Sequence, residues 1–421
     1  MHLTRRKTCR VCGSSALTQV VNLGEQNLQG SFVKPGKEMP PLRKIPTSLI
    51  RCDPMRDESA CGLLQMEYTV PPAILYSAYW YRSGTNSTMT NHLHSIADEA
   101  ISVLGERPEI VLDIGCNDGT LLNAYPHDCE KWGVDPSDLV LGIDKKIKLV
   151  RDFFPSSLLL SNLQNNDKSD KFDIITSIAM FYDLENPVAF ARAVKYVLSI
   201  NGIWCFEMSY MPHMLSSTSY DTICHEHLEY YSLAVIENIL HRSGLKLINA
   251  SINDSNGGSL RCYAIHEHNN RIYPKEYSDN INALRQSEFD MELDTDKPYR
   301  NFQERINVHR DQLMTLIKGL RASGKRIHIY GASTKGNTIL QWCNLDYRMI
   351  EAAADRNHDK DWARTLGTDI PIMSEERSRA MKPDYYLVLP WHFKKEFIER
   401  EQEMIKNGTK FIFPLPTIEI V

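Results

Sequence analysis

The sequence lacks any long apolar run. No stretch of its 421 residues approaches the roughly 20 apolar residues that a transmembrane helix needs. The basic residues 1–10 are followed by no apolar core of a signal peptide. We therefore expect a cytoplasmic protein without a membrane partner, whose ten cysteines are thiols or metal ligands rather than disulfides.

The sequence also lacks a strong excess of one charge. Its 48 Lys and Arg residues nearly balance 53 Asp and Glu residues, which leaves a formal net charge of −5. This balance gives no reason to expect nucleic acid as a partner. The hydrophobic fraction of 42% and the charged fraction of 24% are typical of a globular protein. The length predicts two or three domains, and we expect a monomer or a dimer.

Three familiar site motifs are absent. The turn over residues 115–119 has Gly-x-x-x-Gly spacing and not the Gly-x-Gly-x-x-Gly of a dinucleotide site. A second glycine-containing turn, over residues 331–337, lacks the Gly-Lys-Ser/Thr of a Walker loop. The sequence contains no His-Glu-x-x-His, so His225 and His227 lack a third metal ligand nearby in sequence.

Four cysteines near the N-terminus have the pattern of a metal site. Cys9 and Cys12 are separated by two residues and followed by Gly13, which lets the backbone curl around an ion. Cys52 and Cys61 supply the second pair, with a looser loop of eight residues between them. Four thiolates favour Zn²⁺ in a structural role, because a full shell leaves no position for water. The alternative is four unrelated buried thiols. We expect a small zinc-binding domain over residues 1–70.

The next motif indicates S-adenosylmethionine (SAM). An apolar strand over residues 110–114 enters a turn that opens a helix, the first unit of an open parallel α/β sheet. The glycines of this turn let the backbone approach a ligand, and Asp113 would pair with the cationic part of the methionine. Asp135, about twenty residues later, ends a second strand, where a carboxylate accepts hydrogen bonds from ribose hydroxyls. The candidate SAM contacts are Asp113, Gly115, Asn117, Gly119, Asp135 and Met180.

A densely ionisable segment over residues 220–231 lies farther along the same domain, which we expect over residues 71–270. Further strands are expected over residues 171–177, 202–208, 245–252 and 260–265, and helices over residues 92–104 and 232–244, in the order of a class I methyltransferase. Loops after parallel strands leave from one edge of a sheet. Polar residues of these loops should therefore converge beside the SAM methyl group: Asp183, His225, Glu226, His227 and Asn256. The alternative for the two histidines is a surface or satisfied core position.

The C-terminal part, over residues 271–421, predicts a helical connector and a second Rossmann-like α/β domain. Apolar residues of the connector recur at helical spacing, among them Ile306, Leu313 and Ile317, and a helix of the second domain is expected over residues 395–407. Hydroxyls and a lysine stand where its first turn opens a helix, a position that favours anions. A nucleotide diphosphate on a substrate would suit this turn; the alternative is a fold with packing duties only. The candidate substrate contacts of this domain are Ser333, Lys335, Asn357, Trp391 and His392.

The order of these parts resembles the SAM-dependent nucleotide-sugar C-methyltransferases of deoxysugar pathways. Their plan is an N-terminal zinc domain, a central class I SAM methyltransferase domain and a C-terminal Rossmann-like domain that binds the nucleotide sugar. The motifs that carry the resemblance are Cys9-x-x-Cys12-Gly13, Tyr81-Arg82-Ser83, Val111-Leu112-Asp113-Ile114-Gly115-Cys116-Asn117-Asp118-Gly119, Tyr220-Asp221-Thr222-Ile223-Cys224-His225-Glu226-His227, Gly257-Gly258-Ser259 and Leu389-Pro390-Trp391-His392.

The resemblance implies a reaction and a set of roles. The substrate would be a nucleotide-linked 4-keto-6-deoxy sugar, methylated at C-3, with His227 as general base. An imidazole with a pKa near neutrality suits proton abstraction beside a ketone. Glu226 would orient a histidine or bind a sugar hydroxyl and His225 would hold the enolate oxygen, two roles that could be exchanged. Tyr81 is a candidate sugar contact, although its aromatic segment could instead be a lid packed on the next domain.

Two positions depart from the family pattern. Relatives that use dTDP-sugars often carry Tyr where this chain has Cys224 and His where it has Asp183, and both positions should lie near the sugar. The sugar and its nucleotide, dTDP, GDP or CDP, therefore stay open. The competing functions are an O- or N-methyltransferase, an NAD-dependent oxidoreductase that uses Asp355, and a zinc-bearing binding module.

Overall fold

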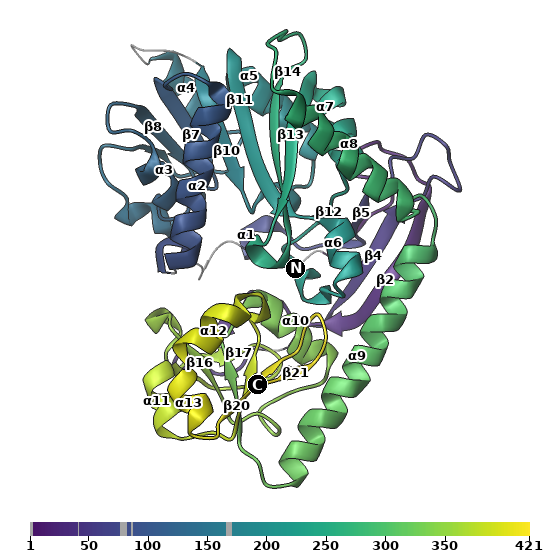
Figure 1. Ribbon diagram of the computed structural model, residues 1–421, viewed down its shortest axis with the longest axis vertical. Coiled ribbons are helices and arrows are strands. Elements are labelled where there is room, and N and C mark those ends of the chain that lie inside the picture. Colours follow the sequence, from purple (N-terminus) through teal and green to yellow (C-terminus); the bar gives the residue numbers. More distant parts are fainter. Residues whose placement is uncertain (1–2, 41, 76–81, 86, 166–170) are drawn as a thin grey trace.

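The computed structural model describes residues 3–40, 42–75, 82–85, 87–165 and 171–421. The chain builds three main sheets: one near the N-terminus, a central one, and one near the C-terminus (Figure 1). Tyr81 and the aromatic residues before it lie outside the described residues, so the predicted sugar contact of Tyr81 stays a prediction.

The N-terminal sheet is antiparallel, in the order β12-β5-β4-β2. Its own strands are β2 (Leu17–Gln26), β4 (Ile45–Cys52) and β5 (Leu64–Met66). The fourth strand, β12 (Glu229–Tyr230), comes from the ionisable segment far along the chain and pairs with β5. Residues 23–25 lie inside β2, where Gly24 with φ of 71° accompanies an irregularity in the pairing with β4.

Two small sheets extend this region. Strand β1 (Thr4–Arg5) pairs with β6 (Tyr68–Thr69). Strand β3 (Phe32–Val33) pairs with β17 (Arg364–Thr365), which belongs to the C-terminal part of the chain. The N-terminal region therefore contacts both later parts of the chain through backbone pairing.

The central sheet has seven strands in the order β13-β14-β11-β10-β7-β8-β9, and all of its neighbours are parallel except those of β14. This order confirms the predicted class I methyltransferase fold. The strands are β7 (Ile110–Ile114), β8 (Glu130–Val134), β9 (Lys148–Val150), β10 (Phe172–Ile178), β11 (Leu198–Ser209), β13 (Leu245–Asn253) and β14 (Ser259–His266).

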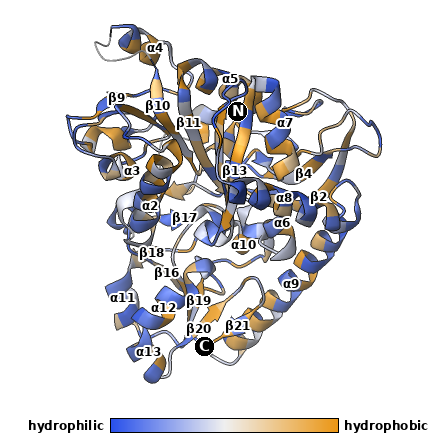
Figure 2. Ribbon diagram, turned by 45° about the horizontal axis from the view of Figure 1, so that its top comes forward, coloured by the Kyte–Doolittle hydropathy of each residue, from blue (hydrophilic) through white to orange (hydrophobic). Residues whose placement is uncertain are grey.

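Helices cover both faces of the central sheet, and the apolar residues between them form two cores. One core lies under α2 (Ser87–Leu104) and α3 (Thr120–Ala124). The other lies under α4 (Ser157–Gln164), α5 (Pro187–Val197) and α7 (Leu233–Ser243). Apolar strands between more polar helices are visible in Figure 2.

The helix boundaries follow local signals. The predicted helix 232–244 is confirmed as α7: the Ser232 hydroxyl accepts a hydrogen bond from Val235 N, and Gly244 ends the helix with φ of 70°. The predicted helix 92–104 begins five residues earlier, at Ser87, because Met89 also packs into the core under α2. The helix α2 therefore includes Met89 as a further core residue.

Two helices connect the central and C-terminal sheets: α8 (Lys275–Asp290) and α9 (Lys297–Ala322). Helix α9 has 26 residues and runs down one side of the molecule from the N-terminal sheet to the C-terminal domain (Figure 1). Ile306, Leu313 and Ile317 are buried along it, as its helical spacing predicted.

The C-terminal sheet has six strands in the order β18-β16-β15-β19-β20-β21, parallel except for β21. This confirms the predicted second Rossmann-like fold. The strands are β15 (Ile327–Tyr330), β16 (Ala352–Asp355), β18 (Ile372–Ser374), β19 (Tyr385–Val388), β20 (Lys410–Phe413) and β21 (Glu419–Ile420). Its helices are α10 (Thr334–Trp342), α11 (Glu375–Ala380), α12 (Lys394–Arg400) and α13 (Gln402–Lys406).

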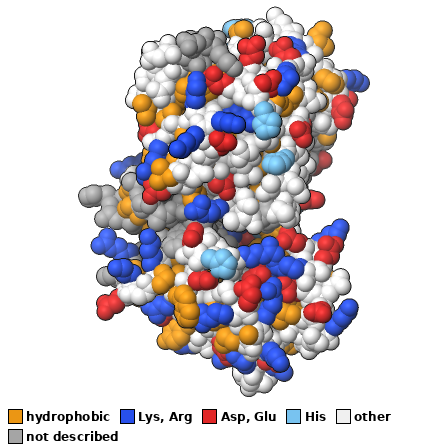
Figure 3. Space-filling view, turned by 90° about the vertical axis from the view of Figure 1, so that its left-hand side faces the viewer, with side chains coloured by type: hydrophobic (Ala, Val, Ile, Leu, Met, Phe, Trp, Pro, Cys, Tyr) orange, Lys and Arg blue, Asp and Glu red, His pale blue; other side chains and the backbone are white. Residues whose placement is uncertain are grey.

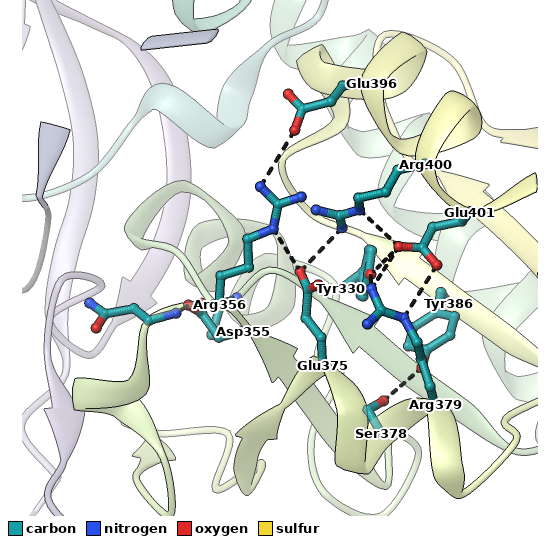
Figure 4. Close-up of polar contacts among 12 residues, drawn as sticks. Tyr330, Asp355, Arg356, Glu375, Ser378, Arg379, Tyr386, Glu396, Arg400 and Glu401 are labelled. Carbon is teal, nitrogen blue, oxygen red and sulfur yellow. Dashed lines mark hydrogen bonds and ion pairs between the residues drawn. The ribbon is translucent and has the colours of Figure 1, made fainter. Parts of the chain in front are cut away.

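The single helix expected over residues 395–407 is divided at Glu401, and this expectation was wrong. The Glu401 carboxylate accepts hydrogen bonds from the Tyr330 hydroxyl at 2.6 Å and from Arg379 and Arg400 at 2.8 Å (Figure 4). Glu401 is buried. Because a buried carboxylate needs such partners, the backbone bends where they hold it.

The remaining elements are short. They are α1 (Pro72–Leu75), α6 (Met211–Ser216) and the 3₁₀ turns η1 (Ser83–Thr85), η2 (Asp138–Gly142), η3 (Phe181–Asp183), η4 (Tyr220–Thr222), η5 (Ser255–Gly257), η6 (His358–Lys360) and η7 (Trp391–Phe393).

The surface carries charges of both signs. On the face in Figure 3, Lys and Arg side chains intermingle with Asp and Glu side chains, which agrees with the nearly balanced composition. Within the described ranges, no helix combines the length and the apolar character needed to cross a membrane.

Candidate active site

The four N-terminal cysteines form one cluster. Their sulfur atoms all lie within 4.8 Å of one another, with Cys9 Sγ 3.5 Å from Cys61 Sγ and Cys12 Sγ 3.4 Å from Cys52 Sγ. Four sulfurs bound tetrahedrally to Zn²⁺ at about 2.3 Å would stand about 3.8 Å apart, so the cluster fits that ion. Gly13, with φ of 78°, closes the turn that carries the first pair. The site is a closed structural zinc site.

The predicted SAM turn follows β7. Gly115 and Gly119 both have φ of 77°, a left-handed conformation that side chains disfavour. A Cβ at Gly115 would lie 3.1 Å from Met180 Cγ, so the turn, Met180 and the end of β10 are packed together. The glycines give the backbone of the turn a path that a larger residue would strain.

Asp113 lies at the end of β7 as a buried carboxyl. Its Oδ1 accepts a 2.6 Å hydrogen bond from Thr176 Oγ1. Burial raises the pKa of Asp113 to about 7, the Thr176 hydroxyl opposes this shift, and the nearby Asp135 adds to it. A cation would remove this penalty, which is the property expected of a group that faces the ammonium of SAM.

Asp135 follows β8 and organises the neighbouring backbone. Its Oδ2 accepts from Asn117 N at 3.0 Å, and its Oδ1 accepts from the N–H and hydroxyl of Ser137 at 2.8 and 2.6 Å. A carboxylate offers about four acceptor positions, so one on Oδ2 is left for a further donor, as the predicted ribose contact requires. Asn117 itself has φ of 51°, and its Oδ1 accepts from Ser83 N at 3.1 Å.

The ionisable segment, residues 220–231, is here named the HEH loop. It runs from η4 to β12 and lies between the central sheet and α10 of the C-terminal domain (Figure 1). Thr338 Oγ1 on α10 donates to Ile223 O at 3.2 Å, and Leu228 N donates to Tyr182 O at 2.8 Å. The loop is therefore fixed on both sides.

His227 has one ring nitrogen fixed. Its Nδ1 lies 2.8 Å from Thr222 O, which makes Nδ1 the protonated nitrogen and leaves the Nε2 lone pair as an acceptor. The ring packs against Tyr182 at 4.3 Å between centroids. Tyr182 lies in η3, and Met180, the residue before η3, packs against Gly115 of the SAM turn. Burial and the nearby Lys335 lower the pKa of His227 to about 3, so the imidazole is neutral.

His225 contacts the N-terminal region with both ring nitrogens. Its Nδ1 lies 2.6 Å from Gln29 Oε1 and its Nε2 lies 3.2 Å from Thr47 Oγ1. Burial lowers the pKa of this imidazole to about 4. With both nitrogens engaged, His225 holds the HEH loop in place, and its predicted contact with an enolate would require one of these bonds to break.

Glu226 is partly exposed, and its carboxyl makes no hydrogen bond or ion pair to any described residue. Its carboxyl lies against Gly30, where an added Cβ would come within 1.7 Å of Oε1. Burial raises its pKa to about 7. Glu226 therefore has both oxygens available for a ligand and exists in both protonation states near neutral pH.

The other predicted contacts differ in exposure. Cys224 is fully buried, and its carbonyl accepts from His227 N at 3.1 Å. Asp183 ends η3 beside the loop. Asn256, with φ of 54°, offers its carbonyl to Lys335 Nζ at 2.8 Å.

Lys335, on α10 of the C-terminal domain, contacts the central domain through Asn256. Its charge lowers the pKa of both His227 and His392, each to about 3 after the larger effect of burial. His392 follows Trp391 in η7, and its Nδ1 has no hydrogen-bond partner in the described part of the chain. The C-terminal domain therefore contributes an ammonium whose charge acts on both imidazoles.

Asp221 is a site residue that the sequence analysis did not single out. It is 1% exposed, its Oδ2 accepts from Trp391 Nε1 at 2.8 Å, and its Oδ1 has no partner among the described residues. Burial raises its pKa and Lys335 lowers it. An acid within the motif Tyr220-Asp221-Thr222 was visible in the sequence, but its tryptophan partner lies 170 residues away.

Ser333 and Asn357 cap short elements in the structure. The Ser333 hydroxyl accepts from Gly336 N at 3.0 Å at the start of α10, and Asn357 Oδ1 accepts from Asp359 N at 2.9 Å. Asp355 uses its carboxylate on Ala332 N at 2.9 Å and Asn357 N at 2.8 Å. These bonds shape the loops of the second Rossmann-like fold from within.

A second buried group also escaped sequence reasoning. Glu207, on β11, lies 2.5 Å from His92 Nε2 and accepts from Asn253 Nδ2 and Arg261 Nε, each at 2.8 Å. Burial raises the Glu207 pKa, but the bond from His92 and the charge of Arg261 hold it below its usual range. The network ties α2 to the strands β11, β13 and β14.

Comparisons with known proteins match the same three parts. Family profiles match a zinc binding domain over residues 9–76, a methyltransferase domain over residues 89–250 and a C-methyltransferase C-terminal domain over residues 254–416. The chain is also similar to the C-methyltransferase NovU of Streptomyces niveus, at 25% identity over 98% of this chain and 96% of that protein.

Solved structures resemble only part of the chain. A SAM-dependent methyltransferase from Clostridium acetobutylicum is 15% identical, covers 42% of this chain and 92% of its own, and has a TM-score of 0.33. The N-methyltransferase NodS from Bradyrhizobium japonicum is 13% identical, covers 43% and 98%, and has a TM-score of 0.32.

The family matches decide among the competing functions. Both the C-terminal domain profile and the NovU relative are described as C-methyltransferases, which sets aside the O- or N-methyltransferase, the oxidoreductase and the binding module. Since the central sheet has the methyltransferase order and the cysteine cluster fits zinc, this chain is a SAM-dependent C-methyltransferase with an N-terminal zinc-binding domain.

Proposed function

We propose that this enzyme methylates C-3 of a nucleotide-linked 4-keto-6-deoxy sugar through an enolate, with His227 as the general base. The observation that carries the proposal is the state of the His227 ring. Its Nδ1 is held by Thr222 O at 2.8 Å, and its other nitrogen is a neutral acceptor beside residues that pack on the SAM turn. A C-methyltransferase needs a carbon nucleophile, and a fixed imidazole can make one from a ketone.

The step balances as a proton transfer followed by a displacement. The C-3 proton moves to His227 Nε2, and the electron pair of the C–H bond delocalises onto the C-4 carbonyl oxygen. Bound SAM supplies the electrophilic methyl group. The enolate then forms the new C–C bond as the bond between that methyl group and sulfur breaks.

Lys335 would serve the anionic groups of the substrate. The Lys335 ammonium, which donates to Asn256 O, lowers the pKa of His227 and His392, and such a cation stabilises an enolate oxygen or a diphosphate. Negative charge on the substrate would in turn offset Lys335 and raise the His227 pKa, which makes the imidazole a stronger base once the substrate is bound.

Glu226 would bind the sugar itself. With a pKa raised to about 7 by burial and no hydrogen bond or ion pair to another described residue, its carboxyl can accept from a hydroxyl or donate to one. Trp391 and His392 would contact the nucleotide side of the substrate, and Ser333 and Asn357 would act indirectly by shaping the loops that they cap. The departures Asp183 and Cys224 leave the sugar to be identified by experiment.

The domain limits 1–70, 71–270 and 271–421 belong to the same proposal, as does a cytoplasmic location. None of the ten cysteines, all of which lie in the described ranges, forms a disulfide, and a reducing compartment would keep the four zinc ligands as thiolates.

The test is turnover of SAM against dTDP-, GDP- and CDP-linked 4-keto-6-deoxy sugars, with carbon NMR of the product. A new methyl carbon bonded to C-3 is expected for one of them. His227→Ala should abolish methyl transfer while SAM and the nucleotide sugar still bind. As a control, Asn256→Ala, which leaves His227 in place, should retain methyl transfer. Near wild-type turnover by His227→Ala, or a methyl group on oxygen, would refute the proposal.

A further inference from the structure

One of the two residues between the zinc-binding cysteines of the first pair is a buried arginine, Arg10. The Arg10 side chain has no exposed surface. Its Nη1 donates to Gln65 Oε1 at 3.1 Å and Met66 O at 2.9 Å, and its Nη2 donates to Thr69 Oγ1 at 2.7 Å. A cation taken fully out of water requires compensation, so its remaining partners are informative.

Those partners belong to the two loops that carry the predicted sugar contacts. Arg10 Nε lies 3.6 Å from Glu229 Oε1, in an ion pair with no exposure on either side. Arg10 Nη2 lies 3.6 Å from Glu185 Oε1. Glu229 follows His227 by two residues, and its other oxygen accepts from Leu184 N at 3.3 Å. One guanidinium thus links the end of the HEH loop to the loop after β10.

The backbone continues the same connection. Strand β12 pairs with β5 of the zinc-binding region, with Glu229 opposite Gln65, and Met66 N donates to Leu228 O at 2.8 Å. Gln65 and Met66 are also the residues that hold Arg10. The segment that follows His227 is therefore an edge strand of the zinc domain's own sheet.

The other end of the HEH loop contacts the same region through side chains. Both ring nitrogens of His225 are bonded to Gln29 and Thr47, and Glu226 rests against Gly30. His227 lies between these two attachments. The N-terminal region contacts the loop on both sides of the proposed base and leaves His227 itself facing the central and C-terminal domains.

We infer that the zinc-binding domain positions the general base, with Arg10 as the positioning residue that links the metal-bound turn to the HEH loop. Zinc would fix the backbone of residues 9–12 and thereby fix where the Arg10 guanidinium stands. Loss of either zinc or Arg10 would leave Glu229 buried without its cation and would release β12 from β5. This inference rests on the proposed role of His227.

The experiment compares Arg10→Met and Arg10→Lys with a matched control, Arg5→Met, which removes a largely exposed arginine of the same region whose partner is Glu67. Zinc per chain, the SAM Kd, kcat and hydrogen exchange of amides 222–231 are measured for each protein. We expect Arg10→Met to keep its zinc and its SAM Kd. Its kcat should fall about 10- to 100-fold, the range for residues that hold a site residue without contacting the substrate, and its amides 222–231 should exchange faster. Arg10→Lys should recover part of kcat, and Arg5→Met should match the wild type.

Unchanged kcat and unchanged exchange in Arg10→Met would overturn the inference, as would equal losses in Arg10→Met and Arg5→Met. If Arg10→Met does not fold, Glu229→Gln with the same measurements tests the other partner of the pair, and normal kcat with normal exchange in that variant also overturns it. Faster exchange over the loop combined with full turnover by His227→Ala would instead locate the failure in the proposed base.

Discussion

The affinity for SAM should depend on pH through Asp113. Burial raises the pKa of this carboxyl to about 7 in the SAM-free protein. The ammonium of bound SAM favours the ionised carboxylate and brings the pKa down. The affinity for SAM is therefore highest well above the raised pKa of about 7. It decreases as the pH falls through that pKa, because protons then compete with SAM for Asp113.

The magnitude follows from the ionised fraction. With a pKa of about 7, about nine in ten Asp113 carboxyls are ionised at about pH 8 and about one in ten at about pH 6. The Kd should therefore increase about tenfold between those values, which corresponds to about 1.4 kcal/mol.

Calorimetric titration of the enzyme with SAM over this range measures the effect directly. Asp113→Asn is the matched control, because it keeps the acceptor for Thr176 Oγ1 and removes the titrating group. It should bind SAM weakly and with little pH dependence. A wild-type Kd that changes less than about twofold between these pH values, or an Asp113→Asn profile as steep as that of the wild type, would refute this account.

Three further predictions concern other parts of the molecule. Gly115→Ala places a Cβ 3.1 Å from Met180 Cγ at φ of 77°; at a cost of about 1–3 kcal/mol for the strained backbone, it should weaken SAM binding without loss of zinc, and unchanged affinity would contradict the packing of the turn. Cys12→Ser removes one of four thiolates; metal analysis should show loss of zinc and thermal unfolding a lower Tm, whereas a full zinc content would disprove the four-cysteine site. Asp221→Ala leaves Trp391 Nε1 without its 2.8 Å acceptor; it should raise the KM for the nucleotide sugar about tenfold, for a charged hydrogen bond of about 1.5 kcal/mol, with the SAM Kd unchanged, and an unchanged KM in initial-rate assays would remove Asp221 from the site.

Local sequence patterns predicted most of the secondary structure. The amphipathic pattern over residues 232–244 predicted α7, which the structure shows capped by Ser232 and Gly244, and the alternation of apolar strands with amphipathic helices predicted the order of the central sheet. These signals work because capping bonds and glycine conformations involve residues within a few positions of one another. The division of residues 395–407 at Glu401 was not predictable in this way, since its partners Tyr330 and Arg379 come from elsewhere in the C-terminal domain.

The ionisable HEH loop illustrates the same limit. Its composition and its place after β11 predicted that His225, Glu226 and His227 would meet near the SAM turn. Its pattern could not distinguish the two histidines, although one has both nitrogens bonded to Gln29 and Thr47 and the other has Nε2 left as an acceptor. That difference arises from Gln29 and Thr47, which lie 196 and 178 residues before His225 in the chain.

The sequence by itself therefore determined the class of chemistry: four thiolates at metal-binding spacing, a glycine turn with its acid, and a dense run of ionisable groups. Such features depend on residue type and short spacing, which a linear pattern records. Only the tertiary structure decided which groups are neutral, which are bonded and which stand open to a ligand. Burial and partners from distant strands set those properties, as Arg10 beside Glu229 and Trp391 beside Asp221 show.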